Sequence, residues 1–90
     1  MIMPNGYYEG DFSGNQRHGF GIYVWTSSGD YYEGNWYSGI KSGKGKLYMK
    51  KDDKFYEGEF KNNKKHGEGK IIAADGVTVL ERGTWNNDIK

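Results

Sequence analysis

A chain of 90 residues with a net charge of +1 forms one small domain, too small to bury the core that surrounds a deep catalytic cleft. Its eight tyrosines, four phenylalanines and three tryptophans occur beside 15 glycines, and this composition favours a half-buried β-sheet over a helical bundle. The absence of cysteine excludes disulfides and thiolate metal sites, and because no apolar run is long enough to span a membrane, we expect a soluble cytoplasmic protein.

The sequence repeats with a period of 24 residues. The tripeptide Tyr-Glu-Gly begins at Tyr8, Tyr32 and Tyr56, and a Gly-x-Gly follows each copy at the same distance, first at Gly19. A fixed period of this length is typical of a protein in which each unit is one supersecondary element stacked on the next. We therefore divide the single domain, residues 1–90, into repeats 7–30, 31–54 and 55–78 and a partial repeat, 79–90.

Each repeat predicts one β-hairpin. In the first repeat, residues 7–12 alternate large and polar side chains, residues 13–18 form a polar loop, and residues 19–25 form the return strand. The second and third repeats follow the same pattern, with loops at 38–42 and 61–66. Residues 80–85 resemble the first strand of another repeat, but their glycine is displaced by one residue and we expect no return strand before Lys90.

Side chains alternate between the two faces of a strand, which assigns one face of each hairpin to the core. We assign the face with the glycines and aromatic residues to the inside, because paired glycines leave a trough in which a ring can lie and bury about 150–250 Å². A valine at Gly45 would fill such a trough. The outer face of the first repeat is then apolar, at Tyr7, Phe20, Ile22 and Val24.

The Tyr-Glu-Gly-x-[Phe/Trp] pattern followed by Gly-x-Gly resembles the MORN (membrane occupation and recognition nexus) repeat over residues 7–85. The resemblance implies an all-β fold, an elongated single-layer antiparallel sheet of consecutive β-hairpins with about three and a half repeats. It also implies a scaffold, dimerisation or targeting module, and the family name comes from a proposed association with phospholipids. The chain departs from the pattern at Leu47, which replaces the tyrosine of the first repeat, and at Glu81-Arg82-Gly83, which replaces Tyr-Glu-Gly.

The sequence predicts no catalytic, cofactor or metal site. His18 and His66 are equivalent, but two hairpins separate them by roughly 20 Å, so we interpret them as surface residues of turns rather than ligands of one ion. Glu9, Glu33 and Glu57 form a row spaced by roughly 10 Å, and pairing with lysines of the outer face explains this row better than acid–base catalysis. We therefore predict a protein that is not an enzyme and has no small-molecule substrate. Nucleic acid is not expected as a partner, because the aromatic rings pack against glycines.

Two functional hypotheses follow from these patterns. The first is a scaffold or protein-interaction module that docks a protein partner, or a second copy of itself, through the apolar outer face of the first repeat. The alternative is a peripheral membrane module. Residues 41–70 carry ten lysines against five acidic residues, a net charge of +5, and each lysine near an anionic surface contributes about 1 kcal/mol. The candidate lipid-binding residues lie in predicted hairpin loops and are Lys41, Lys61, Lys64 and Lys65.

Overall fold

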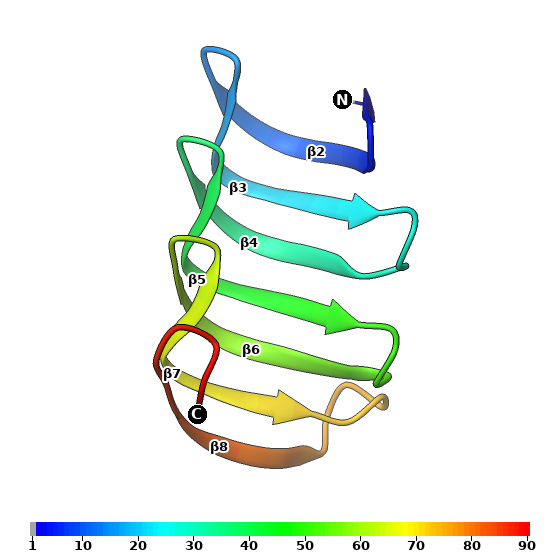
Figure 1. The fold of residues 1–90 in the computed structure, drawn as a ribbon, viewed down its shortest axis with the longest axis vertical. Helices are drawn as coiled ribbons and strands as arrows, with labels where there is room; N and C mark the ends of the chain where they lie inside the picture. The colour runs from blue at the N-terminus through cyan, green and yellow to red at the C-terminus, as the bar shows by residue number, and fades with distance from the viewer. Residues whose placement is uncertain (1) are drawn as a thin grey trace.

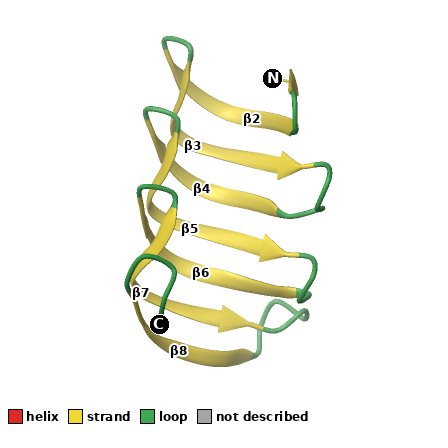
Figure 2. Ribbon diagram, in the orientation of Figure 1, coloured by secondary structure: helices red, strands yellow, loops and turns green. Residues whose placement is uncertain are grey.

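The computed structural model describes residues 2–90, which form one open antiparallel sheet of eight strands (Figure 1). Strands that are consecutive in the sequence are neighbours in the sheet, from β1 at one edge to β8 at the other. Figure 2 shows that loops and turns connect them. The strands are β1 (Ile2–Met3), β2 (Gly6–Ser13), β3 (Gln16–Trp25), β4 (Tyr31–Tyr37), β5 (Ile40–Met49), β6 (Lys54–Lys61), β7 (Lys64–Ile72) and β8 (Val79–Trp85). The predicted single-layer ladder of hairpins is confirmed.

The hairpins close with turns of two residues rather than with the longer loops expected from the sequence. Ser38 and Gly39 join β4 to β5 with φ angles of 47° and 88°, and Asn62 and Asn63 join β6 to β7 with φ angles of 52° and 70°. Two consecutive positive φ angles fit the tight turns whose twist matches that of the flanking strands. The loops predicted at 13–18, 38–42 and 61–66 were therefore too long, and most of their residues belong to strands. In Figure 1 these turns lie one above another along one side of the sheet.

The core consists of tyrosine rings that lie on glycines. Tyr8, Tyr32 and Tyr56 are the largest fully buried side chains, and each ring covers a glycine of the neighbouring return strand. A Cβ atom built on Gly45 would overlap the ring and hydroxyl of Tyr32, and the same overlap would arise between Gly21 and Tyr8. We call the sheet face that carries these rings the inner face. The predicted assignment of glycines and aromatic residues to this face is confirmed.

A β-bulge follows the glycine of each Tyr-Glu-Gly. Between the pairs Gly34–Gly45 and Trp36–Lys41, the single residue Asn35 of β4 stands opposite three residues of β5, so the extra residues belong to the return strand. The other two hairpins show the same irregularity, opposite Asp11 and Glu59. The carbonyl of the residue opposite each bulge accepts a hydrogen bond from the tyrosine hydroxyl, at 2.8 Å in the first repeat, 2.9 Å in the second and 3.0 Å in the third. The bulge therefore satisfies the one polar atom of an otherwise apolar ring.

The partial repeat keeps the register of the ladder by a bulge. Ile71 pairs with Glu81 whereas Ile72 pairs with Val79, so Leu80 is the additional residue that displaced the glycine in the sequence. No further strand follows β8 in the part of the chain that the structure describes, as expected. A single bridge between Asn86 and Ile89 nevertheless closes another two-residue turn, so a fourth hairpin begins.

Candidate interaction surfaces

The apolar residues of the first repeat lie together on the outer face, the face opposite the tyrosine rings. Tyr7 pairs with Val24 across β2 and β3, whereas Ile22 and Phe20 pair with Glu33 and Asn35 of β4. Phe20 is 53% exposed and Tyr7 is 45% exposed, while Ile22 and Val24 are half-buried. The structure thus places the four predicted partner-binding residues on adjacent strands. We call this set, Tyr7, Phe20, Ile22 and Val24, the outer patch.

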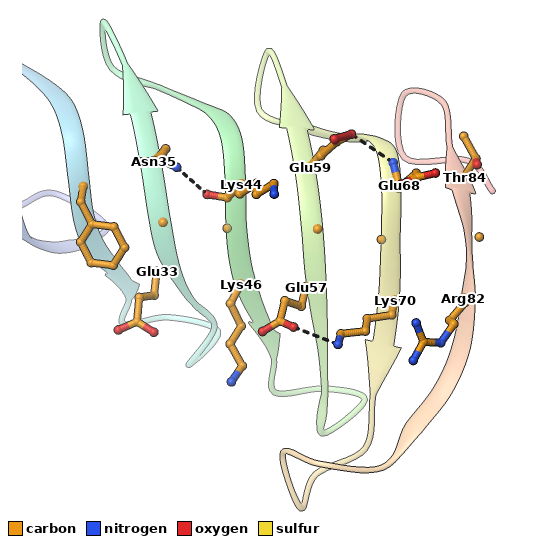
Figure 3. Close-up of a pocket in the computed structure, with 16 residues that line it drawn as sticks. Glu33, Asn35, Lys44, Lys46, Glu57, Glu59, Glu68, Lys70, Arg82 and Thr84 are labelled. Carbon is orange, nitrogen blue, oxygen red and sulfur yellow. Dashed lines mark hydrogen bonds and ion pairs between the residues drawn. The ribbon is translucent and has the colours of Figure 1, made fainter.

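A charged groove of about 1050 Å³ adjoins the outer patch on the outer face, and Phe20 lines it together with charged residues (Figure 3). Its floor is backbone, because a row of positions that includes Gly34, Gly45 and Gly58 crosses the strands and faces the inner side of the sheet. Figure 3 shows a row of side chains along each side of these glycines. Four acidic and four basic residues line the groove, so its formal charges balance. The acidic residues are Glu33, Glu57, Glu59 and Glu68, and the basic residues are Lys44, Lys46, Lys70 and Arg82; both kinds occur in each row (Figure 3).

The carboxylates of this groove that have a partner are bound to the sheet itself. Lys70 Nζ lies 3.3 Å from Glu57 Oε1, which confirms lysine pairing for one member of the predicted glutamate row. Glu59 Oε2 accepts a hydrogen bond of 3.2 Å from the backbone N–H of Glu68 (Figure 3). These bonds tie neighbouring strands together, so these two glutamates have a structural role.

The inner face carries one cation per repeat. Arg17, Lys41 and Lys65 pair with an aromatic residue of the preceding strand, namely Phe12, Trp36 and Phe60. Sequence reasoning missed this row, although a signal was present. Each cation stands two residues before a Gly-x-Gly, and continuing the alternation of the return strand back to that position places it on the inner face.

These cations lie over aromatic rings. The Arg17 guanidinium carbon is 4.6 Å from the centre of the Trp36 ring, and Lys41 Nζ is 5.0 Å from the centre of the Trp25 ring. Lys65 Nζ is 5.5 Å from the Tyr56 ring. Such contacts contribute about 0.5–1 kcal/mol where they are exposed and more where they are desolvated. The cations are therefore held in place rather than mobile in solvent.

The turn of each following repeat fixes the backbone of these cations. Asn63 N–H donates to the Lys41 carbonyl at 3.1 Å, and the Lys41 N–H donates to Asn63 Oδ1 at 2.7 Å. Likewise, Asp88 N–H donates to the Lys65 carbonyl at 2.9 Å, and the Lys65 N–H donates to Asp88 Oδ1 at 2.8 Å. In the first repeat, Gly39 N–H donates to the Arg17 carbonyl at 2.8 Å, and the Arg17 side chain donates to the Gly39 carbonyl at 2.8 Å.

The four candidate lipid-binding lysines do not share one loop edge. Lys41 and Lys65 belong to β5 and β7 and lie over rings on the inner face, so the expectation that they occupy hairpin loops was wrong. The short turns are the reason, because they return these positions to the strands. Lys61 and Lys64 flank the turn between β6 and β7 and are exposed. Of the four candidates, the structure therefore brings together only Lys61 and Lys64 as an exposed pair.

The electrostatics of Lys41 differ from those of a surface lysine. Burial lowers the pKa of its ammonium group, because the charged form loses hydration. The Asp88 carboxylate opposes this shift, and the positive charge of Arg17 adds to it. Lys41 thus carries its charge in an environment that disfavours a cation.

The two histidines lie in strands β3 and β7 rather than in turns. The His18 ring is 5.0 Å from the Tyr37 ring, and His18 Nδ1 accepts a hydrogen bond of 3.2 Å from Ser38 N–H. Across residues 2–90, no group of three or more His, Cys, Asp or Glu side chains is arranged to hold a metal ion. Contacts within the sheet therefore account for His18.

Together, these features define a β-hairpin repeat protein, a single layer whose outer face carries an apolar patch and whose inner face carries cations over rings. The model of the MORN repeat family matches the sequence three times, at residues 8–29, 32–54 and 56–78. These matches cover more than half of the chain, so the protein belongs to the MORN repeat family. A search of curated proteins gives no match. Within residues 2–90, no helix has the length and apolar character needed to cross a membrane.

Proposed function

We propose that this protein is a non-catalytic interaction module that docks a partner through the outer patch, and that a second copy of the chain is such a partner. The observation that carries the proposal is the exposure of Phe20, which is 53% exposed on the outer face beside the charged residues of the groove. The equivalent positions in the second and third repeats are Lys44 and Glu68, which suit a solvated surface. The apolar residue is thus specific to the first repeat.

The composition of the outer patch resembles that of a small interface. Burial of an exposed phenylalanine contributes about 1.5–3 kcal/mol, and Tyr7, at the Val24 end of the patch, adds a second partly exposed ring. Polar residues lie beside part of the patch, since Glu9, Glu33 and Asn35 pair directly with Ile22 and Phe20, whereas Val24 pairs with Tyr31. An apolar centre with a polar rim is the usual arrangement of a protein interface.

The chemistry of the charged groove supports a role without catalysis. Its volume is large, but its floor is backbone, and Glu57 and Glu59 are bound to Lys70 and to the Glu68 backbone. General acid–base catalysis requires a carboxyl group positioned toward a substrate rather than one that joins neighbouring strands. We therefore propose that the groove is structural.

The contacts of the lysines favour protein docking over the lipid alternative. Membrane attraction depends on several cations reaching the lipid surface together. Lys41 and Lys65 lie over inner-face rings, which leaves Lys61 and Lys64 as the exposed pair among the four candidates. Two lysines supply about 2 kcal/mol at most, which is too little for stable membrane association.

Light scattering after size-exclusion chromatography tests self-association through the outer patch. We expect the mass of the wild-type protein to rise from monomer toward dimer with increasing concentration, and the Phe20→Lys/Ile22→Lys variant to remain monomeric. A Val77→Lys/Leu80→Lys variant is the matched control, because it introduces two lysines at apolar residues that are 79% and 51% exposed but far from the patch in sequence. A wild-type protein that is monomeric at every concentration, or a control that loses association equally, would overturn the proposal of a self-docking patch.

A further inference from the structure

A hollow of about 520 Å³ lies on the inner face, opposite the outer patch. The rings of Tyr23, Trp25 and Trp36 line it, and two cationic side chains, Arg17 and Lys41, line it with them. The two cations come from adjacent repeats, one from β3 and one from β5. The hollow therefore combines aromatic walls with two positive charges, and it is separate from the outer patch.

The positive charges in the hollow are not neutralised by an ion pair. Within the described part of the chain, the ion pairs are Lys70 with Glu57 and Lys90 with Glu81, so no carboxylate lies within 4.0 Å of either Arg17 or Lys41. Placing two like charges in a partly buried site is unfavourable unless an anion compensates them. Burial and the charge of Arg17 lower the pKa of Lys41, and the Asp88 carboxylate, which lies beyond ion-pair distance, opposes this shift only in part.

The geometry keeps both cations in position for a ligand. Arg17 is held over Trp36 and donates one hydrogen bond, to the Gly39 carbonyl, although a guanidinium carries five N–H donors. The Lys41 ammonium lies 5.0 Å from the centre of the Trp25 ring, and the backbone N–H of Lys41 donates a hydrogen bond to Asn63 Oδ1. Preformed donors of this kind lose little freedom when they bind an anion, which favours affinity.

We propose that this hollow binds a carboxylate side chain in an acidic segment of a partner protein, with Arg17 and Lys41 as the binding residues. A carboxylate matches the planar fork of a guanidinium, and the aromatic walls accept the apolar atoms of the same segment. A bilayer surface is a poor occupant, because Arg17 and Lys41 line a recess and do not project from an edge. An acidic protein segment can enter such a recess.

The repeat predicts the spacing of the acidic residues. Lys65 occupies the position equivalent to Arg17 and Lys41 in the next repeat, and successive repeats advance the sheet by roughly 10 Å. A chain in the polyproline II conformation has three residues per turn and advances about 3.1 Å per residue, so acidic residues at every third position share one face and would meet one cation in each repeat. The acidic segment is therefore expected to run across the strands.

Fluorescence anisotropy with the full chain tests this proposal. The probe is a fluorescein-labelled peptide with Glu-Ser-Leu repeated three times, and its control has glutamine in place of each glutamate. We expect the glutamate peptide to bind at least about tenfold more tightly than the glutamine peptide, with an affinity that falls as salt rises. We expect Lys41→Gln or Arg17→Gln to weaken the glutamate peptide about tenfold, and Arg17→Lys to recover part of the loss. The matched control, Lys61→Gln/Lys64→Gln, removes two exposed charges outside the hollow and should change affinity less than about twofold.

Several results would overturn the proposal. These are equal binding of the two peptides, no saturable binding of the glutamate peptide, or an equal loss in the Lys61→Gln/Lys64→Gln control. Binding to phosphatidylserine vesicles that Lys41→Gln abolishes would assign the hollow to lipid instead. If Arg17→Gln does not fold, the Lys41→Gln variant and the tryptophan fluorescence of the wild-type protein test the proposal instead. Trp25 and Trp36 line the hollow, so their fluorescence should change when the glutamate peptide binds, and an unchanged spectrum would contradict the proposal. Failure of this test leaves the outer patch unaffected, since that patch lies on the opposite face.

Discussion

Replacement of Gly45 by valine is the most direct perturbation of the core. The Tyr32 ring that covers Gly45 is 0% exposed, and its hydroxyl donates a 2.9 Å hydrogen bond to the Asn35 carbonyl. A Cβ atom at Gly45 would occupy the space of the ring, so the ring must leave its site or the strands must separate.

The structure sets the expected magnitude of this change. Overpacking costs about 1–3 kcal/mol, and loss of the hydroxyl bond adds about 0.5–1.5 kcal/mol. Removal of a strand glycine returns about 0.5–1 kcal/mol of backbone entropy. We therefore expect Gly45→Val to lower the free energy of unfolding by about 2–3 kcal/mol, and the thermal midpoint by about 8 °C or more in a domain of this size.

Urea and thermal unfolding followed by circular dichroism measure this loss. Lys44→Val is the matched control, because it introduces the same side chain at an exposed outer-face position of the same strand and should change stability by less than about 1 kcal/mol. In a Tyr32→Ala background, Gly45→Val should cost much less than it does alone, since the two residues share one site. An unchanged midpoint for Gly45→Val, or an equal cost in both backgrounds, would refute the packing of rings on glycines.

Two further predictions concern pH and lipid. Burial raises the pKa of the Tyr56 phenol from 10.0 to about 12, so the stability that this neutral phenol contributes is complete below pH 10 and is lost as the pH rises toward 12. Thermal midpoints of the wild-type protein should thus fall more steeply between these pH values than those of Tyr56→Phe, and parallel curves would contradict this. Because two of the four candidate lysines lie over inner-face rings, we also expect no co-sedimentation with anionic liposomes at physiological salt. Pelleting that disappears at high salt and in Lys61→Gln/Lys64→Gln would instead support lipid binding.

The repeat and the two faces of the ladder could be predicted from the sequence because the same glycine and aromatic positions recur in each repeat. The spacing of Tyr32 and Gly45, for example, agrees with that of Tyr8 and Gly21, and strand alternation then assigns all four to the inner face. This regularity also exposed the unusual residue, Phe20, at a position where the other repeats are charged.

The bulges and the turns were not predicted, and their physical cause explains the errors that followed. At the bulge opposite Asn35, the Asn35 carbonyl accepts a hydrogen bond from the Tyr32 hydroxyl, and the alternation of side chains in the sequence does not reveal such a bond. The tight turn at Ser38 requires positive φ in a residue that seldom adopts it, so a longer loop was the simpler expectation. Because the predicted loop, residues 38–42, included Lys41, we expected this lysine to be exposed to solvent and did not predict the row of cations on the inner face.

Nuclear magnetic resonance of the backbone amides during dilution tests the central claim most directly, because it locates the docking surface without a mutation. If the outer patch mediates self-association, the amide shifts that depend on concentration will cluster at Tyr7, Phe20, Ile22 and Val24, and residues of β8 will not move. Concentration-dependent shifts confined to the inner face or to β8, with the outer patch unchanged, would contradict the proposed function.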